Sequence, residues 1–191
     1  MSNIKITFPD GNIREYAQGI TALEIAKSIS EGLAKKILVA KVNDKVVDAF
    51  KPITEDATLN LLSWDVKEGK STFWHSTAHL MAEALESFYP GIKFGYGPPV
   101  DNGFYYDVDL GGKEISSDDL TKIGKKMAEL AATNSAYQRK DVSKAEALKY
   151  FSEKGDAYKI ETINELNDGE ISFYQQGNFT DLCRGPHIPN T

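Results

Sequence analysis

Residues 4–24, IKITFPDGNIREYAQGITALE, decide how the first part of the chain folds. Apolar and polar side chains alternate over residues 4–8, which predicts a half-buried strand. Residues 9–12, Pro-Asp-Gly-Asn, are typical of a turn, and residues 13–16 then form a second predicted strand. Residues 21–24, Thr-Ala-Leu-Glu, have capping-box spacing, so a helix is expected to begin there. This part is therefore predicted to be a hairpin followed by a helix.

Three more strands are expected after this helix, which Gly32 is predicted to end. They cover residues 37–42, 46–47 and 58–62. The order strand, strand, helix and then three strands is typical of a small β-grasp domain. It resembles the TGS domain, a ubiquitin-like module at the front of threonyl-tRNA synthetases and some GTPases. This part shows no catalytic constellation, so we expect a compact binding or spacer module.

The charge of the chain is uneven along its length. Of its 191 residues, 41% are hydrophobic and 26% are charged, which is typical of a soluble globular protein. The net charge of −6 lies in residues 64–191, because residues 1–63 carry eight basic and eight acidic side chains. A protein that binds nucleic acid with its whole surface is disfavoured, because phosphate contacts usually require a positive field. The difference in charge predicts two domains, 1–63 and 64–191.

Cysteine content and the first residues indicate the compartment. A single cysteine, Cys183, excludes an intrachain disulfide. The chain begins without the apolar run of a signal peptide, and no stretch approaches the roughly 18 apolar residues of a membrane span. We therefore expect a cytoplasmic protein.

Residues 64–191 are expected to form an α+β domain with a mainly antiparallel sheet. Residues 64–70 are mostly polar and are predicted to be a linker. Helical periodicity and capping patterns predict helices over 73–89, 116–133 and 143–155. Alternating or apolar runs predict strands over 104–110, 137–142, 157–163, 171–176 and 180–182.

All three histidines lie in two short patterns. His75 and His79 are one helical turn apart in H-S-T-A-H, and His187 follows Cys183 by four residues. Three imidazoles and one thiolate are a suitable tetrahedral shell for zinc. Imidazoles that titrate near neutral pH can instead position or deprotonate a water molecule without a metal. The residues leave both chemistries open, although this helix lacks the glutamate of a metalloprotease, which argues against peptide hydrolysis.

Four motifs make the sequence similar to a known family. They are HSTAHL over residues 75–80, GPPVDNGFYYD over 97–107, Tyr-Lys at 158–159 and DLCRGPHIPNT over 181–191. In this order, behind a TGS-like domain, they resemble the editing domain of bacterial threonyl-tRNA synthetases. A related editing fold occurs in alanyl-tRNA synthetases.

This resemblance implies a function. The full enzyme joins threonine to its tRNA with ATP, and this front part hydrolyses serine wrongly attached to that tRNA, with a positioned water. A second site is needed because one methyl group gives only about 1–3 kcal/mol of discrimination. Two other functions stay open: a non-hydrolytic tRNA-binding or regulatory module, and a zinc-dependent deacylase like the alanyl-editing domains.

The resemblance also implies roles for individual residues. His75 and Lys159 would position and activate the attacking water. Asp181 would hold the ammonium or hydroxyl of the seryl group by charge-assisted hydrogen bonds. The remaining residues, which would line the pocket or contact the terminal ribose and the ester, are Tyr105, His79, Cys183 and His187.

Cofactors and partners follow from the same resemblance. No metal is expected to be required here, and a metal, if one binds, is expected on His75, His79, Cys183 and His187. Zinc and ATP would belong to the class II catalytic domain that, like the anticodon-binding domain, is absent from these 191 residues. The expected partner is the acceptor end of tRNA for threonine carrying serine. We expect the full enzyme to be a homodimer through that catalytic domain, and this chain to be a monomer that binds tRNA weakly and in a salt-sensitive way.

Overall fold

The computed structural model describes residues 2–191, which divide into two compact units. The first unit comprises the residues up to Phe73 together with Gly185–Pro189, and the second comprises Trp74–Arg184 together with Asn190–Thr191. This division differs from the predicted boundary after residue 63. The stretch predicted to be a linker instead begins helix α3 (Lys67–Phe88).

The first unit is built on one five-stranded sheet. Its strands are β1 (Asn3–Thr7), β2 (Ile13–Ala17), β3 (Val39–Val42), β4 (Lys45–Val47) and β5 (Ala57–Leu62). The order is β2-β1-β5-β3-β4, in which β1 and β5 are parallel and the other neighbours are antiparallel. The predicted strands are confirmed, and the topology is that of a β-grasp domain.

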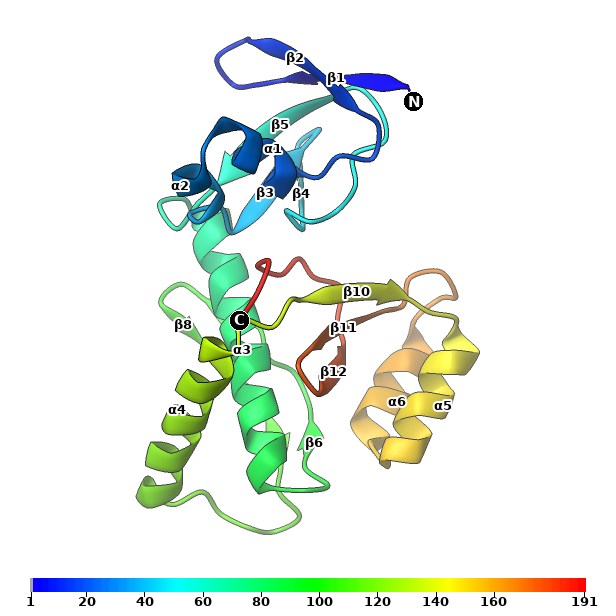
Figure 1. Ribbon diagram of the computed structural model, residues 1–191. Helices are drawn as coiled ribbons and strands as arrows, with labels where there is room; N and C mark the ends of the chain where they lie inside the picture. Colours follow the sequence, from blue (N-terminus) through cyan, green and yellow to red (C-terminus); the bar gives the residue numbers. More distant parts are fainter. Residues whose placement is uncertain (1) are drawn as a thin grey trace. The chain divides into compact units, whose positions relative to one another are not determined.

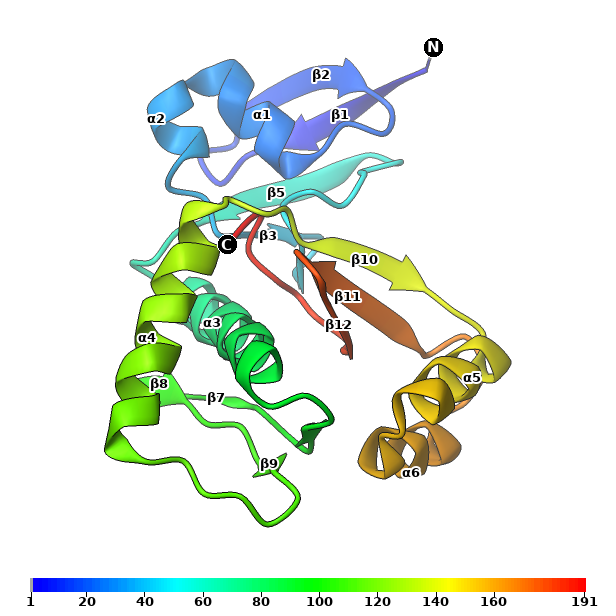
Figure 2. The ribbon, with the colours of Figure 1, turned by 60° about the horizontal axis from the view of Figure 1, so that its bottom comes forward.

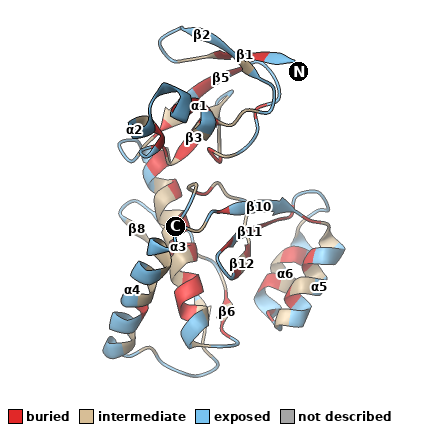
Figure 3. Ribbon diagram, viewed as in Figure 1, coloured by how far each residue is buried: buried red, intermediate tan, exposed pale blue. Residues whose placement is uncertain are grey.

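Helix α1 (Ala22–Ile29) packs on this sheet. The Thr21 side chain accepts from the backbone N–H of Glu24, and Glu24 in turn accepts from the Thr21 backbone, so the predicted capping box is present. Ile25 is fully buried in a core with residues of β1 and β5, and Figure 3 shows buried residues within both strands. The helix ends before Gly32, since Ser30 caps a separate short helix, α2 (Glu31–Ala34).

In the second unit, α3 lies beside helix α4 (Ser117–Ala132), as Figures 1 and 2 show. Their apolar faces share one core with aromatic residues of the neighbouring strands. Short strand pairs follow α3: β6 (Lys93–Phe94) with β9 (Val108–Asp109), and β7 (Pro99–Val100) with β8 (Gly103–Phe104). The single strand predicted over 104–110 is therefore interrupted, because its two ends pair with different partners.

A three-stranded antiparallel sheet forms the other half of this unit. It consists of β10 (Gln138–Asp141), β11 (Ser172–Gln176) and β12 (Phe179–Leu182). Between β10 and β11 the chain forms helices α5 (Lys144–Lys154) and α6 (Ala157–Glu165), which lie side by side (Figure 1).

The strand predicted over 157–163 is wrong, because this segment is helix α6. Asp156 caps its first turn by accepting from the backbone N–H of Lys159 at 3.2 Å. Ile160 and Ile163, three residues apart, then face the same apolar cluster as Phe151 of α5. The cap and this spacing stabilise a helix where the local alternation alone is ambiguous.

None of the helices among residues 2–191 is long and apolar enough to cross a membrane.

Candidate active site

Helix α3 and the end of β12 bring three of the predicted residues together. The rings of His75 and His79 have centroids 5.2 Å apart and meet nearly edge to face. Cys183 directly follows β12, and its Sγ lies 3.3 Å from His75 Nε2. The sheet register continues to this point, since Cys183 donates its backbone N–H to the Ser172 carbonyl at 3.0 Å. The ligand-type atoms of His75, His79 and Cys183 all lie within 4.8 Å of one another.

A second cluster joins Lys159, Asp181 and Tyr106. Lys159 Nζ lies 2.8 Å from Asp181 Oδ1 and 3.1 Å from Oδ2, and both side chains are over nine-tenths buried. The Tyr106 hydroxyl donates to Asp181 Oδ2. The Lys159 ammonium also faces the Gly95 carbonyl at 3.4 Å. This is a buried ion pair with hydrogen-bonded partners, the arrangement in which losing one charge is most costly.

The Asp181 carboxylate is fully occupied by donors from its own chain. Oδ1 accepts from Lys159 and from the Leu182 backbone N–H, which lies at 2.8 Å, and Oδ2 accepts from Lys159 and Tyr106. Burial acts to raise the pKa of Asp181, but the Lys159 charge and these hydrogen bonds outweigh it and lower the pKa. Asp181 is therefore an anion that orients Lys159 and Tyr106, and a substrate ammonium would have to compete with them.

Burial controls the two other titratable groups of this region. It lowers the pKa of His79 to about 3, against a favourable effect of Asp181, so His79 is neutral at physiological pH. Burial also raises the pKa of Tyr106 well above its ordinary value, reinforced by Asp181, which keeps the phenol a donor. Asp181 of β12 and Cys183, which continues the register of that strand, are two residues apart and join the two clusters into one site.

A glycine makes room for Tyr106. A side chain at Gly97 would place its Cβ 2.7 Å from the Tyr106 ring, so only glycine allows the ring to lie there without displacement. Gly97 belongs to the Gly-Pro run that the sequence singles out, which gives that motif a packing reason.

The structure places Tyr106, and not Tyr105, beside Lys159 and Asp181. The Tyr105 side chain is 51% exposed, whereas Tyr106 is packed against Phe94 with ring centroids 5.2 Å apart. The predicted role of Tyr105 in lining the pocket stays a prediction; Tyr106 was not among the predicted site residues, although a signal for it was present. In the alternation over 104–110, Tyr106 lies on the apolar side with Val108, and Tyr105 lies on the polar side.

His187 lies in the segment Gly185–Pro189, which clusters with the first unit. It is fully buried, and its backbone N–H donates to Asp48 Oδ1 at 2.8 Å. Its predicted contact with the ribose or the ester stays a prediction.

The donor set on α3 and β12 fits a zinc ion. Imidazole nitrogen and thiolate sulfur are the usual zinc ligands, and tetrahedral bonding requires ligand atoms about 3.3–3.8 Å apart. The separation of 3.3 Å between His75 Nε2 and Cys183 Sγ is already in this range, and the ligand-type atoms of all three residues lie within 4.8 Å of one another. His75, His79 and Cys183 can therefore hold a metal, and the same groups can hold a water molecule.

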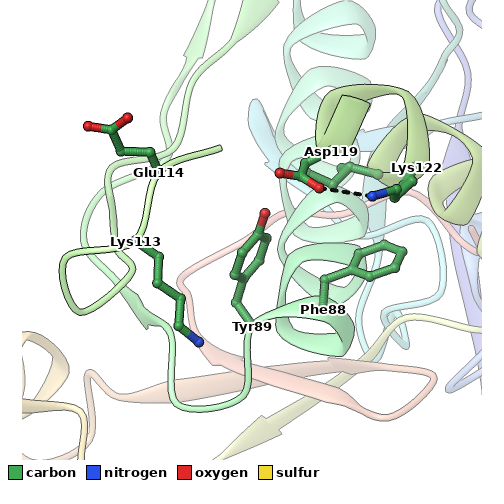
Figure 4. Close-up of a pocket in the computed structure, with 7 residues that line it drawn as sticks. Phe88, Tyr89, Lys113, Glu114, Asp119 and Lys122 are labelled. Carbon is green, nitrogen blue, oxygen red and sulfur yellow. Dashed lines mark hydrogen bonds and ion pairs between the residues drawn. The ribbon is translucent and has the colours of Figure 1, made fainter. Parts of the chain in front are cut away.

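A pocket elsewhere in the unit, of about 350 Å³, shares no residue with this site. Figure 4 shows it between the end of α3 and the start of α4, lined by Phe88 and Tyr89 together with charged side chains. Asp119 and Lys122 in its wall already form an ion pair at 3.2 Å. The pocket has no convergent polar groups comparable to the buried ion pair, so the candidate active site is the one described above.

Comparisons with known proteins find two families along the chain. Residues 4–63 match the family described as TGS domain, and residues 171–191 match the one described as Threonyl and Alanyl tRNA synthetase second additional domain. The chain is 60% identical over 188 residues to the threonine–tRNA ligase of Cytophaga hutchinsonii, 57% to that of Parabacteroides distasonis and 59% over 189 residues to that of Porphyromonas gingivalis. Each comparison covers 98% of this chain but 29% of the relative.

The fold, the site and these matches define a chain with a TGS-type domain and a region similar to the second additional domain of threonyl and alanyl tRNA synthetases. More particularly, the homologues of this chain are threonine–tRNA ligases, and it corresponds to their N-terminal part. It spans less than a third of the length of the curated relatives it matches.

Proposed function

We propose that the second unit hydrolyses the ester that links serine to tRNA for threonine, and so removes serine attached by mistake. The observation that carries this proposal is the buried Lys159–Asp181–Tyr106 cluster beside the His75–Cys183 contact. Together these groups offer a base, a cation and a phenolic donor in a region largely shielded from water, as hydrolysis of an ester requires.

In the proposed reaction, the oxygen of a water molecule attacks the carbonyl carbon of the seryl ester. His75 accepts the proton of that water through Nε2, and the bond between the carbonyl carbon and the ribose oxygen breaks. The ribose oxygen takes up a proton, and free serine and tRNA leave. The neutral His79, one turn from His75, restricts the His75 ring from one side.

The Lys159 ammonium supplies positive charge where the carbonyl oxygen becomes negative. Asp181 keeps the ammonium in place, and the Tyr106 hydroxyl keeps Asp181 in place. Such fixed charges are worth more in a buried site than in water. In this proposal Lys159 stabilises charge while His75 moves the proton.

A zinc-dependent deacylase is the second candidate, and the three donors on α3 and β12 favour it. Zinc held by His75, His79 and Cys183 would supply a polarised water at neutral pH. We keep the metal-free reaction as the first proposal, because the buried Lys159 ammonium already supplies positive charge for the carbonyl oxygen. We also propose that the full-length enzyme joins threonine to its tRNA with ATP and forms a dimer. We propose in addition that the protein is cytoplasmic.

Hydrolysis of seryl-tRNA for threonine by the purified chain tests the proposal. We expect the rate to fall by about 10²-fold or more in His75→Ala and Lys159→Ala, and to be unchanged by a chelator. Lys149→Ala, an exposed lysine of α5, is the matched control and should keep the full rate. Loss of activity in chelator with recovery on zinc would replace the metal-free reaction with the zinc-dependent one. Full activity in both variants would overturn the assignment of the site.

A further inference from the structure

Two buried side chains, Gln176 of β11 and Tyr137 directly before β10, donate to the backbone of α3 next to its histidines. The Tyr137 hydroxyl donates to the carbonyl of Ser76 at 2.7 Å, and Gln176 Nε2 donates to the carbonyl of His79 at 3.0 Å. Both carbonyls lie inside a regular helix and already face the N–H four residues on. The additional donors therefore do not complete the helix; they attach the histidine-bearing turn to the sheet.

Gln176 lies on the sheet face that carries Asp181. Tyr137 directly precedes Gln138 of β10, which is opposite Gln175 of β11, so it lies near the end of β11 that carries Gln176. Gln176 and Tyr174 share a face of β11, and Tyr174 is opposite Asp181. One face of one sheet thus holds the helix and presents the carboxylate.

A third residue completes the attachment from the helix side. Glu83, one turn after His79, accepts the backbone N–H of Asn178 at 3.2 Å in the turn between β11 and β12. A Cβ at Gly177 would lie 2.3 Å from Glu83 Oε1, so this turn and the carboxylate fit tightly. The turn of α3 and the β11–β12 hairpin are therefore joined at both ends.

We propose that Tyr137, Gln176 and Glu83 are positioning residues that fix the histidine turn of α3 relative to the hairpin that carries Asp181 and Cys183. Apolar packing alone lets a helix slide or rotate on a sheet, whereas a donor aimed at one carbonyl specifies both its position and its rotation. A helix displaced from this position would leave buried donors without a hydrogen-bond partner, which costs free energy. The expected effect on the rate of hydrolysis rests on the proposed function. The expected effect on the position of α3 does not.

Two conservative substitutions remove the donors without changing shape. Tyr137→Phe and Gln176→Met each delete one hydrogen bond to α3. Matched controls make the same changes nearby: Tyr150→Phe on α5, and Gln175→Met at the exposed neighbouring position of β11. Glu83→Gln keeps an acceptor for Asn178, whereas Glu83→Leu does not, so the pair tests rescue by a conservative variant.

Hydrogen exchange of the peptide that spans residues 76–83 gives the structural readout. We expect exchange about three- to tenfold faster in Tyr137→Phe, Gln176→Met and Glu83→Leu, as for the loss of one buried hydrogen bond, and wild-type exchange in Glu83→Gln and both controls. Unchanged exchange in Tyr137→Phe and Gln176→Met would overturn the inference. This measurement does not depend on catalysis.

Hydrolysis of seryl-tRNA gives the second readout. We expect kcat to fall about 10- to 10²-fold in Tyr137→Phe and Gln176→Met with KM unchanged, because misplacement by a fraction of an ångström affects the reaction more than binding. Equal kcat in variant and control would overturn the positioning role. If the wild-type chain hydrolyses nothing, the proposed function fails, and the exchange measurement still decides whether these residues hold the helix.

Discussion

Replacing one partner of the Lys159–Asp181 ion pair should destabilise the second unit more than any surface substitution. The two charges lie 2.8 Å apart with exposed side-chain fractions of 7% and 3%. Removing one member of such a pair leaves a buried charge without its counter-ion, which costs about 3–5 kcal/mol. The two single variants should lose different amounts of stability, because the charge that is left behind keeps different contacts in each.

Asp181→Asn leaves the Lys159 ammonium with two long contacts, to the Gly95 carbonyl at 3.4 Å and the Tyr106 hydroxyl at 3.5 Å. Lys159→Met leaves the carboxylate with the Tyr106 hydroxyl and the Leu182 N–H at 2.8 Å. We therefore expect a loss near the upper end of the range, about 5 kcal/mol, for Asp181→Asn, and about 3 kcal/mol for Lys159→Met. The double variant should lose less than the sum, since neither charge is left alone.

The assay must report on the second unit by itself, because the chain has two compact units and does not justify a two-state analysis. Hydrogen exchange at increasing urea, read on peptides from α6 and β12, gives that local free energy of opening. Lys149→Met and Glu153→Gln form the control pair, since their charges lie 4.0 Å apart and are 76% and 68% exposed. This pair should change stability by less than about 1 kcal/mol. Single losses no larger than the control, or a double variant that equals the sum, would refute the reasoning.

Three further predictions follow from the same contacts. Because burial lowers the pKa of His79 from 6.5 to about 3, the unfolded chain binds a proton that the folded chain does not between these values. The free energy of unfolding should therefore fall by about 1.4 kcal/mol per pH unit as pH drops through that window. Burial raises the pKa of Glu83, so Glu83 opposes this effect above its ordinary pKa of 4.5. Hydrogen exchange of second-unit peptides at increasing urea, at pH 7, 6 and 5 in wild type and His79→Asn, measures the difference. Tyr106→Phe should lower the rate of seryl-tRNA hydrolysis by about tenfold, and Tyr105→Phe should leave it unchanged; the reverse order would contradict the placement of the two rings. Gly97→Ala should displace the Tyr106 ring and destabilise the unit by about 1–3 kcal/mol, whereas Gly124→Ala on α4, which has open space around it, should not destabilise it.

Local sequence signals predicted the helices that begin with a capping box. Thr21 and Ser143 begin helices at the expected residues because a hydroxyl and a glutamate three residues later satisfy the free N–H groups of the first turn. Helix α6 was missed because its apolar residues fit both a strand and a helix over so short a length. Whether this segment forms a helix depends on its packing against α5, which the sequence of the segment does not contain.

Some contacts of the candidate site could also be predicted from local sequence, and others could not. The pairing of His75 with His79 follows from helical periodicity and could be predicted from their spacing. The contact of Lys159 with Asp181 joins residues 22 positions apart on a helix and a strand, and no local rule predicts it. The resemblance to editing domains brought both residues forward, but only the structure shows that the carboxylate is occupied by Lys159, Tyr106 and the backbone. The proposed role of Asp181 therefore changes from holding substrate to orienting Lys159 and Tyr106.

The most direct test of the central claim is the ratio of two single-turnover rates, hydrolysis of the seryl ester and of the threonyl ester on the same tRNA, by the 191-residue chain. An editing site must prefer the ester that lacks the methyl group, and a steric difference of one methyl is worth about 1–3 kcal/mol, which corresponds to a ratio of about 5 to 150. We predict a ratio in this range in favour of serine, with the seryl rate abolished in His75→Ala. Equal rates for the two esters, or two esters as stable as in buffer, would contradict the account.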